Sequence, residues 1–183
     1  MRTEDHLDYA RRMVDGLKIS PWQKRAFKLG CIIPDYNKFT YMGHHLSDWS
    51  LGHSYHVRKR EIVEFFSKPY TGSLLWWYRA GLRIHYLGDS FSRPHNPEFG
   101  YRSRPHVAYE WKLHDLMQQV LEERRFRAAK VRGDLRSWLE RRHRHYMKAT
   151  EGIRQDSYFI DTPLMGVCDW VKEHRLPEHI LRM

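Results

Sequence analysis

The stretch SLLWWYRAGLRIHYLGDSF, residues 73–91, together with the SRPH that follows it as far as His95, decides how this chain folds. Residues 73–91 are apolar on more than one helical face, which predicts a central and mostly buried helix. His85 and Asp89 are four residues apart in this stretch, so they would lie on the same face of the helix. Because Pro94 favours a helix end, His95 can bend back toward that face.

The polar pair in this apolar helix points to a metal site. A buried carboxylate costs free energy unless it is paired or binds a metal ion. His106 and Glu110 repeat the four-residue spacing a short way along the chain. Imidazole and carboxylate ligands without a thiolate are typical of catalytic zinc. We therefore predict a metal site here, and the alternative is a His–Asp hydrogen bond inside the core.

Helical periodicity dominates the rest of the chain, and we find no sustained alternation of the kind strands show. Ser20-Pro21 has the pattern of a helix start, and Pro34-Asp35-Tyr36-Asn37 predicts a loop that lasts to about residue 52. The expected helices cover residues 4–17, 20–30, 53–67, 73–91, 105–130, 133–149, 163–173 and 177–182. The fold class predicted is all-α, a single-domain helical bundle over residues 1–183.

Composition narrows the setting. The chain has 183 residues and a net charge of +10. It has no apolar run of about 18 residues and no apolar region near its start, so we expect a cytoplasmic protein. Cys31 and Cys168 are far apart and form no motif, which favours reduced structural thiols.

Much of the positive charge lies in residues 124–148, which hold ten Lys or Arg residues. One interpretation is a solvated basic helix face. The other is a docking surface for an anionic membrane, as in a peripheral membrane protein, or for nucleic acid.

Metal clusters usually draw ligands from several elements, and the N-terminal half offers further candidates. Asp35 follows an apolar turn that would place it inward, although an Asx turn beside Pro34 would also explain it. His6, taken alone, could be a surface or capping residue. Four more histidines lie between these residues and the central helix, namely His44, His45, His53 and His56.

With these residues assembled, the chain resembles the zinc-dependent phospholipase C and S1/P1 nuclease superfamily over about residues 3–120. The strongest motif is His-x-x-x-Asp-x5-His followed by His-x-x-x-Glu, present as His85, Asp89, His95, His106 and Glu110. Asp-His-Leu at 5–7 is similar to the early zinc-ligand region of the family, and Pro-Asp-Tyr at 34–36 is similar to its ligand Asp and adjacent Tyr. The resemblance implies an all-α fold and a zinc cluster that hydrolyses phosphate esters.

By resemblance, one zinc would take Asp35, His53, His85 and Asp89, and a second would take His95, His106 and Glu110. A third would take His6 and share Asp89. The family's next ligand after Asp35 matches His53 best, then His56, then His45. In secreted members the third ion also binds an N-terminal Trp, which this chain lacks. The third site would therefore be vacant, weaker, or completed by another group such as Glu4 or Asp5.

The sequence thus predicts a metal-dependent phosphoric ester hydrolase of the phospholipase C type. Asp35 and Asp89 would be catalytic, and by resemblance Tyr36 would bind the headgroup of a phospholipid or another phosphodiester. One alternative is a single-strand nuclease of the same fold. Others are an iron or manganese protein with non-hydrolytic chemistry, and a helical nucleic-acid-binding module with incidental histidines.

Overall fold

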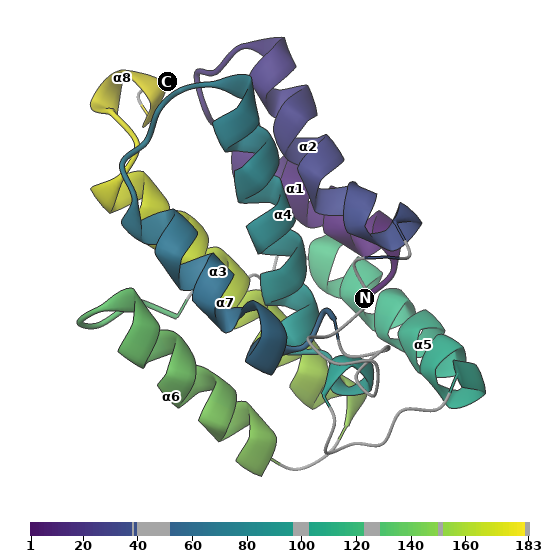
Figure 1. Ribbon diagram of the computed structural model, residues 1–183. Helices are drawn as coiled ribbons and strands as arrows, with labels where there is room; N and C mark the ends of the chain where they lie inside the picture. The colour runs from purple at the N-terminus through teal and green to yellow at the C-terminus, as the bar shows by residue number, and fades with distance from the viewer. Residues whose placement is uncertain (38, 40–51, 97–102, 123–128, 150–151, 182–183) are drawn as a thin grey trace.

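A computed structural model describes residues 1–37, 39, 52–96, 103–122, 129–149 and 152–181 of the chain. The described residues form helices joined by loops, and no strand occurs among them, which confirms the all-α prediction. Figure 1 shows their arrangement. The helices are α1 (Thr3–Asp15), α2 (Pro21–Tyr36), α3 (Tyr55–Ser67), α4 (Leu74–Ser90), the short 3-10 helix η3 (Arg93–His95), α5 (Ser103–Glu122), α6 (Leu135–Lys148), α7 (Ile153–His174) and α8 (Glu178–Leu181).

Helix α4 lies at the centre of the molecule, as its apolar sequence predicts. It packs against α1, α2, α3 and α7 (Figure 1). Every residue from Ile84 to Ser90 is buried, including the charged and polar ones. The helix starts at Ser73, whose side chain accepts a hydrogen bond from the Trp76 amide at 3.0 Å. Because the residues from Ile84 to Ser90 are all buried, the C-terminal end of α4, which carries His85 and Asp89, lies inside the protein.

Two glycines bring the backbones of α2 and α4 into direct contact. A Cβ atom at Gly30 would lie 2.1 Å from the Tyr78 carbonyl oxygen, and one at Gly81 would lie 2.2 Å from the Phe27 carbonyl oxygen. No other residue type fits at either position without moving a helix. This close approach sets the distance between the C-terminal halves of the two helices, where Asp35 and His85 lie.

Helix α2 continues further than the sequence predicts. The expected helix end near residue 30 and the loop starting at Pro34 are wrong, because α2 runs through Pro34 to Tyr36. Proline lacks an N–H, so Pro34 leaves one intrahelical hydrogen bond unformed, and α2 nevertheless continues two residues past it. The Asn37 amide then closes the helix on the Ile33 carbonyl at 3.1 Å. Asp35 is consequently a helix residue with a fixed direction.

The C-terminal part of the chain also differs from prediction. The expected short helix 163–173 is the second half of α7, which begins at Ile153 and has Pro163 in its interior. An interior proline costs about 3 kcal/mol, and the burial of all but one of the α7 residues from Asp156 to Cys168 offsets that cost. Residues 129 and 130, which we expected to be helical, are not, and residues 123–128 lie outside the described part of the chain.

Other features agree with the sequence. The Ser20 side chain accepts a hydrogen bond from the Gln23 amide at 3.2 Å at the start of α2. Cys31 and Cys168 are buried free thiols. None of the described helices is long and apolar enough to cross a membrane.

Candidate metal centre

Asp89, near the end of α4, lies at the centre of a buried group of histidines. One carboxylate oxygen, Oδ1, lies 3.1 Å from His6 Nε2 and 3.6 Å from His95 Nε2. The other, Oδ2, lies 2.7 Å from His53 Nδ1 and 3.2 Å from His85 Nε2. The Asp89 side chain is only 1% exposed. Four imidazoles from separate parts of the chain therefore converge on one carboxylate.

His85 is held in one orientation by a backbone group of α2. Its Nδ1 lies 2.8 Å from the Cys31 carbonyl oxygen. Because a carbonyl only accepts, Nδ1 must carry a proton, and Nε2 is the ring nitrogen that faces the cluster. A hydrogen bond of this kind, from the other ring nitrogen to a backbone carbonyl, commonly orients metal-binding histidines.

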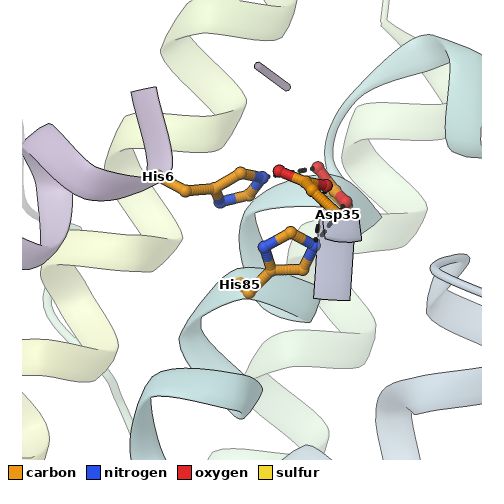
Figure 2. A group of neighbouring side chains, drawn as sticks. His6, Asp35 and His85 are labelled. Atoms are coloured by element: carbon orange, nitrogen blue, oxygen red, sulfur yellow. Dashed lines mark hydrogen bonds and ion pairs between the residues drawn. The ribbon is translucent and has the colours of Figure 1, made fainter. Parts of the chain in front are cut away.

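His6 from α1 and Asp35 from α2 complete the group around His85. Figure 2 shows the His6 and His85 rings and the Asp35 carboxylate directed toward one another from three helices. The two rings stack with centroids 3.8 Å apart, and Asp35 Oδ1 lies 3.6 Å from His85 Nε2. The Thr3 hydroxyl donates to the other Asp35 oxygen at 2.7 Å, which restrains that carboxylate.

The structure distinguishes among the three histidine candidates of the N-terminal half. His53, just before α3, is fully buried beside Asp89. Its segment is held by Arg58, which donates to the Gly52 carbonyl at 2.5 Å. His56 instead lies near His143, with ring centroids 6.0 Å apart. His45, like His44, lies outside the described residues. The geometry thus favours His53 as the cluster residue.

His95 and Glu110 form a further pair of potential ligands beside Asp89. His95 Nε2 is 3.5 Å from Glu110 Oε1. His95 belongs to η3 and Glu110 to α5, so two separate elements form this pair. The backbone of His106 lies in α5, one helical turn before Glu110, but its side chain lies outside the described part of the structure. Its role as a ligand stays a prediction.

Charge in the cluster is divided unequally. Burial disfavours the charged form of Asp89, but electrostatic interactions with His95 and with the N-terminal amino group hold its pKa well below the usual value. Burial lowers the pKa of His53 to about 3 and also lowers the pKa of His6. For His85, burial is outweighed by the Asp89 carboxylate, and the pKa rises. Near neutral pH, His6 and His53 are neutral imidazoles, the form that binds metal.

The arrangement fits a metal cluster. Among the described residues, two sets of side chains have potential ligand atoms within 4.8 Å of one another: one is His6, Asp35, His85 and Asp89, and the other is His53, Asp89 and His95. Asp89 belongs to both sets, and each of its two oxygens lies near one histidine of each set. His6 groups here with Asp35 and His85, whereas the resemblance assigned it to a separate ion. The division of ligands among ions stays a prediction.

The α-amino group of Met1 also reaches this cluster, which sequence reasoning missed. Its nitrogen lies 2.9 Å from Asp89 Oδ1 and 3.0 Å from Glu110 Oε1. Burial alone would lower its pKa, but the Asp89 and Glu110 carboxylates raise it to about 12. The Met1 side chain lies against Gly88, where an added Cβ would be 3.3 Å from its sulfur. No local motif in the sequence indicates that the terminal amino group lies beside Asp89 and Glu110.

The two carboxylates considered for completing the third site have other partners. Glu4 is exposed and pairs with Arg2 at 2.9 Å. Asp5 is fully buried, but it accepts from His114 Nδ1 at 2.6 Å, away from Asp89. Neither side chain contributes to the two groups described above.

Two further polar residues support the turn between Asp89 and His95. Asn96 donates to the carbonyl oxygens of Ser90 and Ser92 at 3.1 and 3.0 Å. His143 of α6, which is buried, lies with its Nε2 3.0 Å from Asn96 Oδ1 and 3.2 Å from the Ser90 carbonyl. Since both of these partners accept, the His143 nitrogen donates. The signal for such a role was weak, because His143 stands among arginines in a helix that reads as basic surface.

Tyr36, by contrast, is not part of the cluster. It follows Asp35 at the end of α2 and is 71% exposed. Its position beside a cluster carboxylate is compatible with contact to a bound molecule.

Comparisons with known proteins give a family. Neither a search of curated proteins nor a search of solved structures found a match. The sequence profile of the family described as zinc dependent phospholipase C matches residues 5–153, which is most of the chain and includes the eight residues predicted as metal ligands from His6 to Glu110. The chain therefore belongs to the zinc-dependent phospholipase C family.

Proposed function

We propose that this protein hydrolyses phosphodiesters with two or three zinc ions held by the buried cluster, and that its substrate is a phospholipid. The observation that carries the proposal is the placement of Asp89, which belongs to both groups of potential ligands. The family supports zinc and a phospholipid substrate. Iron or manganese would suit the same ligands, so the metal is part of the test.

The cluster residues would have distinct roles in the reaction. When bound, divalent ions would neutralise charge on the phosphoryl oxygens and lower the pKa of a bound water. Asp35, held by Thr3 and facing the site, would orient the attacking water and accept its proton. Asp89 would fix the spacing of the two ligand groups. His85 is kept in the tautomer that presents Nε2 by its bond to the Cys31 carbonyl.

Tyr36 would contact the headgroup. Its ring is exposed and directly follows Asp35 in the chain, so it can lie against a bound molecule without a change in the core.

Three further expectations stay predictions: a cytoplasmic location, a single domain over residues 1–183, and contact between the basic residues 124–148 and an anionic membrane. In α6, exposed basic residues include Arg136, Arg141 and Arg144.

The experiment is a substrate panel on zinc-reconstituted protein. Phosphatidylcholine vesicles, a water-soluble phosphodiester and single-stranded DNA are offered with and without chelator, and released products are measured. Chelator-sensitive release of a phosphorylated headgroup that Asp35→Asn abolishes would support the proposal. A Tyr36→Ala variant should raise KM for the lipid and leave turnover of the small phosphodiester unchanged. Zinc-loaded protein that cleaves none of the three would contradict it.

The second candidate is a single-strand nuclease. The net charge of +10 favours it, because phosphate contacts and base stacking hold single strands. Faster cleavage of DNA than of lipid in the same panel would select this function.

A further inference from the structure

Asp156, on α7, is a buried carboxylate that lies outside the metal cluster. Asp156 is only 1% exposed. It accepts hydrogen bonds from the Arg93 backbone amide at 2.8 Å and from the Tyr146 hydroxyl at 3.2 Å, and the Tyr109 hydroxyl also donates to it. One side chain thus joins η3, α5 and α6 to α7.

Two of these three donors lie next to proposed ligands. Arg93 opens the 3-10 turn that carries His95, and the turn is closed by the Asn96 amide on the Arg93 carbonyl at 3.0 Å. Tyr109 immediately precedes Glu110 on α5. Both donors bond to the same Asp156 oxygen, Oδ2. The relative position of His95 and Glu110 is therefore linked to one atom on a third element.

The cost of burying this carboxylate suggests a specific role. Burial raises the pKa of Asp156, against the opposing effect of the Tyr109 and Arg93 hydrogen bonds. An apolar side chain on α7 would pack the same space without that cost, but it would leave the Arg93 amide and two hydroxyls without their acceptor. Residues that orient metal ligands typically change metal affinity 10–100-fold when they are replaced.

We propose that Asp156 is a positioning residue for the metal ion held by His95 and Glu110. The inference rests on the proposed function, since it takes His95 and Glu110 as ligands. It extends the functional part of the chain into α7, of which the family match covers only the first residue, Ile153. The proposed role of Asp156 depends on geometry and not on charge, because Asp156 belongs to neither group of potential ligands.

The chemistry of an amide gives a clear test of this role. In Asp156→Asn, the amide oxygen in the place of Oδ2 can still accept from the Arg93 amide and the Tyr109 hydroxyl. The amide nitrogen in the place of Oδ1 can donate to the Tyr146 oxygen. Asp156→Ala removes all three bonds. Tyr146→Phe removes only the bond to α6 and is the matched control.

The experiment measures zinc affinity by competition with a chromophoric chelator, using the full chain. We expect Asp156→Ala to weaken one ion about 10–100-fold and leave the remaining ion or ions unchanged, with Glu110→Gln weakening the same ion. Asp156→Asn and Tyr146→Phe should bind zinc like the unaltered protein.

Three results would overturn the inference. Asp156→Ala could bind every ion as tightly as the unaltered chain. It could weaken all of them equally together with the melting temperature, which would indicate a purely structural role. Asp156→Asn could behave like Asp156→Ala, which would make charge the cause. An unaltered chain that binds no ion is a different result, because it would contradict the proposed function itself.

Discussion

Replacing Asp89 with Asn is the most informative single change in this molecule. The substitution keeps the shape of the side chain, so it removes the charge without making a cavity. In the structure, Oδ1 faces His6 and His95, while Oδ2 faces His53 and His85. Whichever way the amide turns, its NH2 group points at one pair of histidines and cannot bind a metal there.

The size of the effect follows from these contacts. Replacing a residue that only orients a ligand already weakens metal binding about 10–100-fold, so losing a bridging ligand should weaken each ion it contacts by at least about 100-fold. Because Asp89 belongs to both potential ligand groups, more than one ion should be lost. Hydrolysis of phosphodiester should become undetectable.

The assay is elemental analysis of metal per chain, with turnover measured on the same samples. Asp161→Asn is the matched control, since Asp161 is also a buried carboxylate, 3% exposed, but lies near Tyr9 of α1 and outside both ligand groups. The control should keep its metal. An Asp89→Asn protein that keeps every ion and full activity would refute the idea that this carboxylate joins the two groups.

Three other predictions concern packing, ligand choice and pH. Gly81→Ala should destabilise the fold by about 1–3 kcal/mol in urea unfolding because its Cβ meets the α2 backbone, whereas Gly16→Ala, with nothing within 4 Å, should change stability by less than about 1 kcal/mol; equal effects would contradict the contact. His53→Ala should lower metal content and His56→Ala should not, and the reverse result in elemental analysis would reassign the ligand. Burial lowers the pKa of His143 to about 3; since the unfolded chain takes up this proton near pH 6.5, stability should be full above that pH and fall by up to about 1.4 kcal/mol per unit as pH drops toward 3. Urea unfolding at several pH values gives the free energy of unfolding as a function of pH. This free energy should fall less steeply with decreasing pH for His143→Phe, and an unchanged pH dependence would argue against a buried neutral imidazole.

The sequence predicted the fold class and the central helix because local signals agree there. Residues 73–91 are apolar around the helix, and Ser73 and Ser20 are strong start signals. The sequence failed where tertiary packing outweighs a local breaker. Pro34 and Pro163 both lie inside helices, and the second is held there by the burial of α7 on most of its surface.

Part of the candidate site was predictable, since helical spacing pairs His85 with Asp89, while His6, Asp35 and His53 were proposed as ligands from the family resemblance. Its supports were not, because they depend on which distant elements meet. Nothing local indicates that the Cys31 carbonyl faces His85, or that Asp156 reaches the Arg93 amide across 63 positions of the chain. The first contact depends on the close approach of α2 and α4 at Gly30 and Gly81, and the second depends on where α7 meets η3.

The measurement that tests the central claim most directly is the number of metal ions per chain, determined by elemental analysis on protein purified without a tag. The account predicts two or three ions, mostly zinc, with phosphodiester hydrolysis in the same sample. Two or three ions of iron or manganese without hydrolysis would keep the cluster and contradict the proposed reaction. A chain that binds no metal after reconstitution would contradict the account as a whole.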